Sequence, residues 1–275
     1  MRKTEKQILI KHTLVNQILT PCGISSIEYS LNPYIGCAHG CAYCYARYLL
    51  LRRGYGPEDW GKVVYIKSNA VSRLKDEIRW RGRGKVYLSS ATDPYQPVEK
   101  EYQITRRLLE ILVKYDWPVE ILTKSTLILR DLDLIRTISD IRVGVSISVT
   151  EDFRRVFEPF ASSYDERLRV LKRLVDVLGE ERVHVFFAPF LPVLSEYSLD
   201  AIIDDISNVG IQRLFLDKLN IKAQNWITIN KALERIGINK KDFWKKAKDM
   251  AYWNKIVKDV IKKAIARRLE LNILF

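Results

Sequence analysis

Short hydrophobic runs alternate with amphipathic stretches over residues 85–216. The runs are rich in β-branched residues, which is typical of strands, and they cover 85–89, 119–123, 142–148, 182–188 and 212–216. Between them, apolar residues recur three and four positions apart, a spacing that predicts helices over 102–115, 130–138, 164–178 and 195–208. Strands that alternate with helices indicate parallel β–α–β units, so we expect an α/β protein.

A further strand is predicted near 27–31 and a helix after Cys44, which brings the β–α units to about six. Six units fit a partial (β/α)6 barrel better than a closed barrel of eight. A doubly wound sheet is the structural alternative. In both architectures ligands bind at the carboxyl ends of the strands, so the polar residues there are the first candidates for a site.

The C-terminal residues 231–275 depart from this alternation. They contain 13 Lys and Arg against 5 Asp and Glu, a net charge of +8, and their apolar residues recur at helical spacing. We therefore predict a lead-in segment over 1–26, a core over 27–216, and a basic helical extension over 217–275 that packs on the core. A solvated basic face is the preferred interpretation of the extension, and a nucleic-acid-binding arm is the alternative.

The whole chain of 275 residues carries a net charge of +13. This excess suits a polyanionic partner, with nucleic acid as the first candidate, while a merely Lys-rich surface explains it equally well. No apolar run approaches the roughly 20 residues of a membrane-spanning helix. The basic N-terminus lacks the features of a signal peptide. We expect a cytoplasmic protein that does not associate with membranes.

Three of the four cysteines lie within eight residues, in the segment NPYIGCAHGCAYCYAR at 32–47. The C-x3-C-x2-C spacing puts Cys37, Cys41 and Cys44 on one loop, where three thiolates can hold three irons of a 4Fe–4S cluster and leave the fourth iron open. A structural zinc usually takes four ligands, and the nearby extra candidates are His39 and Cys22. His39 lies between two of the cysteines, which is an unfavourable place for a fourth ligand. Zinc is therefore the weaker alternative.

This segment resembles the signature of the radical S-adenosylmethionine (radical SAM) superfamily. More narrowly, it is similar to the branch related to spore photoproduct lyase and often described as DNA repair photolyase. The resemblance continues over about residues 27–216, through SSATDPYQPVEKEYQITR at 89–106, ILTKST at 121–126, and the EPF and ERL blocks within 158–168. It implies a partial barrel of the radical SAM type that binds a 4Fe–4S cluster and S-adenosylmethionine.

The resemblance also implies the reaction. One electron, from a reductant such as a ferredoxin or flavodoxin, cleaves S-adenosylmethionine into methionine and a 5′-deoxyadenosyl radical. That radical abstracts a hydrogen atom from the substrate, while the protein orients and shields the cofactor.

Polar residues that follow two of the strands are candidates for the methionine end of the cofactor. Ser90, Thr92 and Asp93 follow the strand at 85–89, where the family receives the amino group. The resemblance assigns Lys124, after the strand at 119–123, to the carboxylate. An ordinary Asp-Pro turn and a solvated surface lysine are the structural alternatives.

Three further residues are candidates for the nucleoside end. Ser146 and Ser148 alternate along the strand at 142–148 and so point to one face, from which they can bond the ribose hydroxyls. Buried serines bonded to the backbone are the alternative. The resemblance places the backbone of Tyr43 near the adenine. Arg167 matches an arginine of the family's ERL block but has no assigned role, and His184 is interpreted as structural, as is His12.

The chain departs from spore photoproduct lyase at the residue that donates a hydrogen atom. That enzyme uses a cysteine where this chain has Ser90 or Ala91, and the O–H bond of a serine is too strong to replace a thiol. Cys22 is the one cysteine outside the triad. We interpret it as a buried small hydrophobe, with a hydrogen donor as the alternative. The residues that act on the substrate are therefore unassigned.

Three functions are compatible with these features. The first is a lyase-like radical SAM enzyme that acts on a nucleic acid or nucleotide, which uses both the triad and the +13 charge. The second is a radical SAM enzyme that acts on a protein, peptide or small metabolite, for which the charge is incidental. The third is a non-catalytic nucleic-acid-binding protein with a structural metal site, which lacks a suitable fourth ligand. We favour the first.

Overall fold

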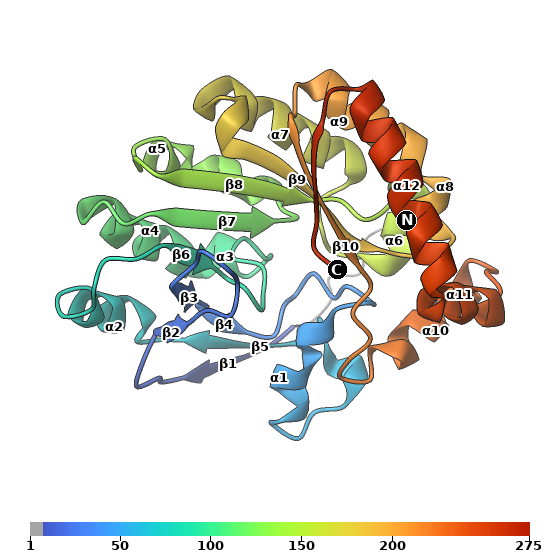
Figure 1. Ribbon diagram of the computed structural model, residues 1–275. Coiled ribbons are helices and arrows are strands. Elements are labelled where there is room, and N and C mark those ends of the chain that lie inside the picture. Colours follow the sequence, from blue (N-terminus) through green and yellow to red (C-terminus); the bar gives the residue numbers. More distant parts are fainter. Residues whose placement is uncertain (1–7) are drawn as a thin grey trace.

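The computed structural model describes residues 8–275. Within them, eight strands form a curved main sheet in which neighbours are parallel, except for the antiparallel pair β2 and β3 (Figure 1). In sheet order the strands are β11 (Glu270–Ile273), β10 (Arg213–Lys218), β9 (Val183–Phe190), β8 (Ile141–Ser146), β7 (Val119–Thr123), β6 (Val86–Leu88), β3 (Tyr29–Leu31) and β2 (Leu19–Pro21).

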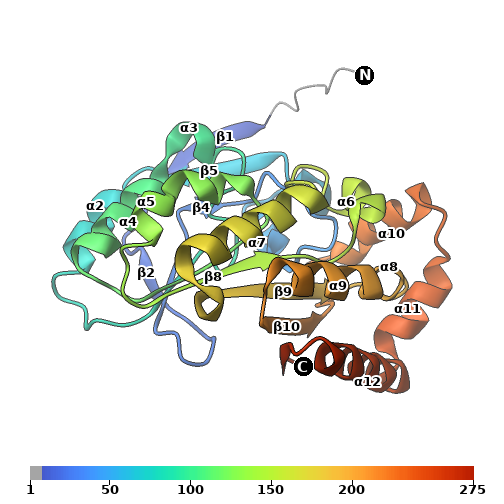
Figure 2. The same ribbon diagram turned by 90° about the horizontal axis from the view of Figure 1, so that it is seen from above.

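The predicted α/β architecture, a partial barrel, is confirmed. The six strands expected from the sequence correspond to β3, β6, β7, β8, β9 and β10, and they are consecutive in the sheet. Helices of the crossover connections cover its outer face (Figures 1 and 2). Leu108 and Leu112 share one buried core with Val119 and Ile121 of β7. Burial of the helix and strand faces against each other is what closes each β–α–β unit.

Twelve α-helices are present in the described residues. They are α1 (Tyr48–Leu51), α2 (Ala70–Glu77), α3 (Glu99–Tyr102), α4 (Ile104–Lys114), α5 (Leu132–Ile135), α6 (Glu151–Phe157), α7 (Tyr164–Leu178), α8 (Leu194–Tyr197), α9 (Leu199–Val209), α10 (Asn225–Arg235), α11 (Lys240–Lys248) and α12 (Met250–Ala266).

The helix predicted over 164–178 has these same bounds because both of its ends carry strong signals. The Ser163 hydroxyl accepts a hydrogen bond from the Glu166 amide, the Glu166 carboxylate accepts one from the Ser163 amide, and Gly179 follows the last turn. The helix predicted over 130–138 is shorter. Ser125 accepts a hydrogen bond from the Leu127 amide and starts a 3-10 turn over Thr126–Asp131, ahead of α5.

A second, three-stranded sheet lies beside the first and was not predicted. It consists of β1 (Leu9–Thr13), β5 (Val63–Lys67) and β4 (Tyr34–Ile35), with β1 and β5 parallel and β4 antiparallel to β5. The strand β4 has only two residues, too few for a periodic signal. Its position matters because the cysteine segment begins directly after it.

Residues 217–275 contain the three helices α10, α11 and α12 and the strand β11. Helix α12 buries Tyr252, Trp253, Ile256, Val260 and Ala264 and contacts α9, while many of its lysines stay exposed. The strand β11 then pairs in parallel with β10, so the end of the chain extends the main sheet.

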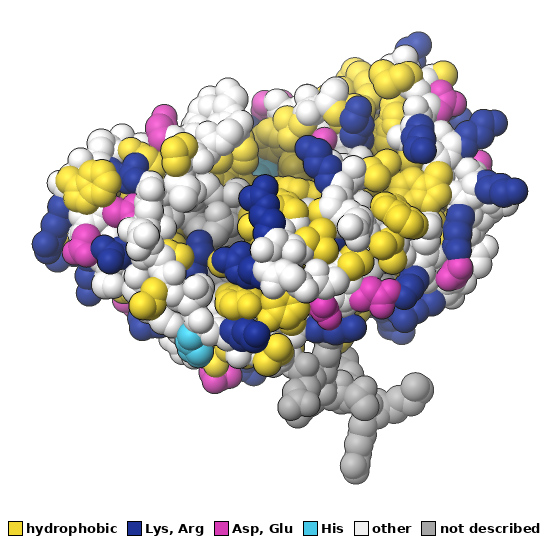
Figure 3. Space-filling model, turned by 90° about the horizontal axis from the view of Figure 1, so that it is seen from below, with side chains coloured by type: hydrophobic (Ala, Val, Ile, Leu, Met, Phe, Trp, Pro, Cys, Tyr) yellow, Lys and Arg dark blue, Asp and Glu magenta, His cyan; other side chains and the backbone are white. Residues whose placement is uncertain are grey.

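One face of the molecule, seen from below in Figure 3, has Lys and Arg side chains spread over it and around a hollow near its middle. No helix in residues 8–275 is long and apolar enough to cross a membrane.

Candidate radical SAM site

The three cysteines lie on one loop between β4 and the 3-10 turn Tyr45–Arg47. Cys37 and Cys41 are buried and Cys44 is half-buried. The loop starts with a sharp turn at Gly36, whose φ is +86° and whose hypothetical Cβ would lie 2.3 Å from the Val63 carbonyl oxygen. Only glycine combines a left-handed backbone with so close an approach to the neighbouring strand.

Arg47 holds the end of this loop from inside the protein. Its side chain, 1% exposed, donates hydrogen bonds to the carbonyls of Cys44 (2.9 Å), Cys41 (3.0 Å) and Ala42 (2.9 Å). A planar guanidinium can bond several carbonyls at once, which fixes the loop's curvature. This role of Arg47 was not predicted, although Arg47 lies three residues after the last cysteine.

The start of the loop is held by Gln96, which is fully buried. Its amide oxygen accepts from the Ala38 amide at 2.8 Å, and its nitrogen donates to the Gly36 carbonyl at 3.2 Å. Gln96 lies in the DPYQP segment that the resemblance includes, so that segment serves the cysteine loop directly.

Helix α10 holds the middle of the loop from a distant part of the chain. Asn225 donates to the Tyr43 carbonyl at 2.8 Å, and Thr228 donates to the Ala42 carbonyl at 2.6 Å. These contacts join residues more than 180 positions apart in sequence. No local pattern marks them.

The three cysteine thiols suit a metal cluster, because the positive charge of the metal stabilises thiolates. Burial raises the pKa of Cys41 to about 12 and that of Cys37 well above its usual value. The thiolates that ligate iron therefore need a nearby cation, and a bound metal deprotonates a thiol outright. Within residues 8–275, no three His, Cys, Asp or Glu side chains are gathered closely enough to hold a single metal ion. The loop carries three thiols, two of them buried and one half-buried, and this donor set suits a larger group such as a 4Fe–4S cluster.

His39 and Asp93 pair behind the loop. The His39 Nδ1 lies 3.4 Å from a carboxylate oxygen of Asp93, and His39 is 2% exposed. Asp93 also accepts from the Thr123 hydroxyl at 2.7 Å and from the Lys124 amide at 2.8 Å. Burial by itself would raise the pKa of the Asp93 carboxyl, but His39 and these hydrogen bonds outweigh it and lower that pKa to about 2. Asp93 thus connects the cysteine loop to the end of β7.

The other two residues predicted after β6 have different surroundings. The Thr92 hydroxyl is buried and has no hydrogen-bond partner among the described residues, so it is available to a ligand. The Ser90 hydroxyl bonds the Ser30 hydroxyl, and the Ser90 carbonyl accepts from the Tyr45 hydroxyl at 3.2 Å.

The remaining candidates gather around Lys124. The Lys124 ammonium donates to the Ser146 hydroxyl at 2.7 Å and lies 5.9 Å from the centre of the Tyr43 ring. Ser146 and Ser148 both donate to the Ala188 carbonyl, at 3.0 and 2.7 Å. The structure therefore brings these four residues together from the cysteine loop and two adjacent strands.

Glu158 and Arg167 explain the EPF and ERL blocks. They form a buried ion pair beneath Tyr43, whose hydroxyl donates to the other oxygen of the Glu158 carboxylate. Arg167 also donates to the Ser146 carbonyl at 3.0 Å. Burial alone would raise the pKa of Glu158, yet the charges of Arg167 and Lys124 prevail and lower it. Arg167, which had no assigned role, supports Tyr43 and Ser146 from behind.

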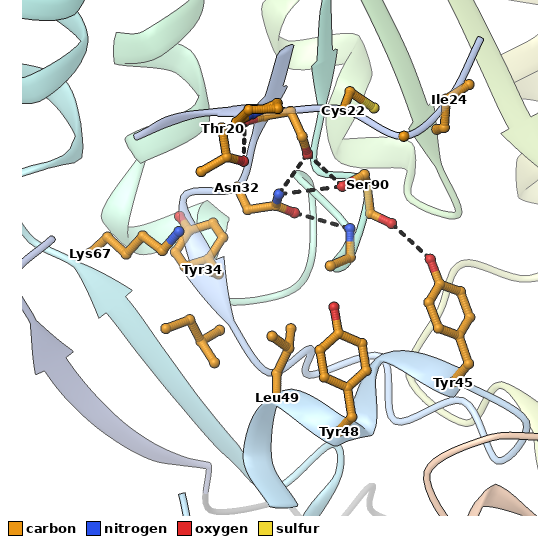
Figure 4. Close-up of a pocket in the computed structure, with 15 residues that line it drawn as sticks. Thr20, Cys22, Ile24, Asn32, Tyr34, Tyr45, Tyr48, Leu49, Lys67 and Ser90 are labelled. Atoms are coloured by element: carbon orange, nitrogen blue, oxygen red, sulfur yellow. Dashed lines mark hydrogen bonds between the residues drawn. The ribbon is translucent and has the colours of Figure 1, made fainter. Parts of the chain in front are cut away.

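A cavity of about 360 Å³ adjoins the cysteine loop (Figure 4). Ile35 and Tyr45, which precede and follow the triad, form part of its wall, together with Cys22, Tyr48, Lys67 and Ser90. Cys22 is half-buried. The interpretation of Cys22 as a buried hydrophobe is therefore wrong: β2 ends at Pro21 and the following loop places the thiol at the cavity.

Residues 31–206 match the radical SAM superfamily. The chain belongs to this superfamily. An uncharacterized protein of Methanocaldococcus jannaschii is 37% identical over 177 residues, 64% of this chain and 65% of that protein. An uncharacterized protein of Mycobacterium tuberculosis is 33% identical over 206 residues, 71% of this chain and 60% of that protein. The chain thus spans less than two thirds of the length of both relatives.

Among solved structures, the fold is similar to that of spore photoproduct lyase. A single-residue mutant of that enzyme superposes with a TM-score of 0.73 at 14% identity, over 97% of this chain and 82% of the lyase. A lyase mutant with bound AdoMet and dinucleoside spore photoproduct gives a TM-score of 0.71 over the same shares. SuiB of Streptococcus suis, bound to S-adenosylmethionine, gives 0.56 over 89% of this chain and 49% of SuiB, also at 14% identity.

Proposed function

We propose that this enzyme holds a 4Fe–4S cluster on Cys37, Cys41 and Cys44 and acts on a nucleic acid or nucleotide. The observation that carries the proposal is the buried, three-cysteine loop inside the region that matches the superfamily. When bound, the cluster supplies the electron that cleaves S-adenosylmethionine to a 5′-deoxyadenosyl radical. A one-electron reductant of the cytoplasm, such as a ferredoxin or flavodoxin, would reduce the cluster.

The chain's own residues would orient S-adenosylmethionine beside the loop. The Thr92 hydroxyl has no hydrogen-bond partner within residues 8–275. Its oxygen would accept a charge-assisted hydrogen bond from the amino group of S-adenosylmethionine. We expect the Lys124 ammonium, which donates to the Ser146 hydroxyl, to pair with the methionine carboxylate. Ser146 and Ser148 donate to the Ala188 carbonyl, and their oxygens would accept hydrogen bonds from the ribose hydroxyls. The Tyr43 carbonyl, which accepts a hydrogen bond from Asn225 on one side, is the proposed contact for the adenine. Asp93 accepts a hydrogen bond from the Lys124 amide and remains a candidate for the amino group of the cofactor.

Three observations support a nucleic acid or nucleotide as the substrate. The chain carries a net charge of +13, which attracts polyanions. A fold neighbour at 97% coverage of this chain, spore photoproduct lyase, has been solved with a dinucleoside photoproduct bound. The cavity beside the loop has room for a nucleotide-sized group.

Cluster binding is tested by anaerobic reconstitution. Wild-type protein reduced with dithionite should contain about four irons per chain and convert S-adenosylmethionine to 5′-deoxyadenosine. Replacing any triad cysteine by alanine should abolish both the iron content and the product. Cys22→Ala is the matched control and should keep the full iron content. One zinc per chain, with no iron uptake, would overturn the proposal.

Substrate class is tested with oligonucleotides. Single- and double-stranded DNA and RNA should bind with an affinity that falls steeply with salt, and one of them should increase the rate of 5′-deoxyadenosine formation. Acidic peptides with the same net charge as the oligonucleotides serve as the comparison. If peptides stimulate turnover and no nucleic acid does, the substrate is a peptide or protein.

A further inference from the structure

Lys67 projects into the cavity without a counter-ion. It comes from the end of β5 and extends toward Asn32 and Tyr34 (Figure 4). The ammonium group forms no ion pair or hydrogen bond with any residue of 8–275, and none of the residues that line the cavity is Asp or Glu. A half-buried cation in a wall without acids is electrostatically incomplete.

Burial and the charge of Arg53 both act on this group. Together they lower the pKa of Lys67 to about 8. Arg53 itself bonds the Leu49 carbonyl at 3.1 Å and stacks on the Tyr65 ring, with no carboxylate partner in the described chain. Arg53 is exposed and does not line the cavity, but its charge repels that of Lys67. An anion bound beside Lys67 would offset both the burial and this repulsion.

A second donor faces the same space. Tyr48, the first residue of α1, directs its hydroxyl into the cavity (Figure 4) and has no hydrogen-bond partner in residues 8–275. The other polar side chains are already used: Asn32 bonds Ser30 and the Ala91 amide, and Tyr45 bonds the Ser90 carbonyl. The unused groups are thus donors that suit an oxyanion.

We propose that Lys67 and Tyr48 bind a phosphate group of the substrate, in a nucleotide or a nucleic-acid strand. The remaining wall supports this choice, because the rings of Tyr45 and Tyr48 and the apolar Ile24, Ile35 and Leu49 offer a surface for a base. The inference rests on the proposed function, since it names how the nucleotide substrate is held. Because Tyr45 follows Cys44 directly, a nucleotide bound here lies next to the cysteine loop.

The test uses cluster-loaded protein under anaerobic conditions and compares deoxynucleoside 5′-monophosphates with the matching nucleosides. Calorimetry gives the affinity, and alkylation of Cys22 by iodoacetamide, read by mass spectrometry, reports whether the cavity is filled. Cys22 lines the cavity and is the only cysteine outside the triad. We expect nucleotides to bind at least about tenfold more tightly than nucleosides, as hydrogen bonds to a charged group would give, and to slow the alkylation of Cys22.

Three substitutions test whether Lys67 and Tyr48 cause the preference for nucleotides over nucleosides. Lys67→Met keeps the aliphatic stem and should remove the nucleotide preference, Lys67→Arg should retain most of it, and Tyr48→Phe should weaken it about threefold to tenfold. Lys75→Met, on the exposed side of α2, is the matched control and should change nothing. Iron content and thermal unfolding verify that each variant is folded.

Equal affinity for nucleotides and nucleosides in the wild-type protein would overturn the inference. It would also be overturned if Lys67→Met kept the preference, or if a dicarboxylate such as succinate protected Cys22 while nucleotides and inorganic phosphate did not. An oligonucleotide that slows the alkylation of Cys22 when mononucleotides do not would support binding of an internal phosphate of a nucleic-acid strand. These outcomes can be distinguished from failure of the proposed function, in which the wild-type protein takes up no iron, forms no 5′-deoxyadenosine, or is stimulated by peptides and by no nucleic acid.

Discussion

Glu158 and Arg167 form an ion pair in which neither side chain is more than 1% exposed. The pair lies directly behind Tyr43 and Ser146, so it connects α7 to the cysteine loop and to β8. Charges buried this deeply require each other, because neither can be solvated by water.

Removing one partner should therefore be more damaging than removing both. We expect Glu158→Gln, which keeps an acceptor for Tyr43, to lower the free energy of unfolding by about 3 kcal/mol. The double variant Glu158→Gln with Arg167→Met should recover a large part of that loss, because no unpaired charge remains. Urea denaturation of the three proteins measures the difference. Equal stability of the single variant and the wild type would contradict a buried ion pair.

Gly36 should be intolerant of a side chain. Gly36→Ala forces a left-handed backbone on alanine and drives its Cβ into the Val63 carbonyl, at a cost of about 2 kcal/mol or more. The turn would shift, so we expect loss of iron from the loop together with lower stability. Gly82→Ala is the control, because its Cβ would meet nothing within 4 Å. Iron analysis and thermal unfolding of both variants provide the comparison.

Thr92 should matter for the cofactor and not for the fold. Its hydroxyl is buried and has no partner within residues 8–275, so Thr92→Val removes an unsatisfied group and should leave the free energy of unfolding unchanged or raise it by up to about 1 kcal/mol. The same change should weaken binding of S-adenosylmethionine roughly fivefold to tenfold. Calorimetry with S-adenosylmethionine and urea denaturation separate the two effects. A destabilised variant with unchanged affinity would assign Thr92 to packing.

His184 should make the protein less stable in mild acid. Burial, with help from Arg142 and Arg213, lowers the pKa of His184 to about 4, so the folded protein keeps it neutral. Between its ordinary pKa near 6.5 and 4 the unfolded chain binds the extra proton, and stability falls as pH falls. From pH 7 to pH 5 this amounts to roughly 2 kcal/mol.

The comparison for that prediction is His184→Met, measured by urea denaturation at both pH values. The variant should lose correspondingly less stability on acidification, since Met does not titrate. His184 also packs against Gly144, where a Cβ would lie 2.3 Å from its ring, so its interpretation as a structural residue agrees with these contacts. Identical pH dependence of variant and wild type would show that other groups dominate.

Features that depend on neighbours along the chain could be predicted from the sequence. The alternation of β-branched runs and amphipathic stretches predicted the six central strands and helix α7, because strand and helix periods and capping residues are local properties. The spacing of Cys37, Cys41 and Cys44 is likewise local, and so is the position of Thr92 and Lys124 after their strands. These local features predicted the radical SAM family.

Contacts between distant segments were decided only by the tertiary structure. The sequence contains no local signal that Asn225 holds the Tyr43 carbonyl, that Gln96 holds the start of the cysteine loop, or that β4 pairs with β5. Cys22 and Lys67 are 45 positions apart in the sequence. They line one cavity because the fold places the ends of β2 and β5 beside the cysteine loop. Burial, charge compensation and cavity shape arise from such packing, whereas pattern along the chain records only which face each segment must bury.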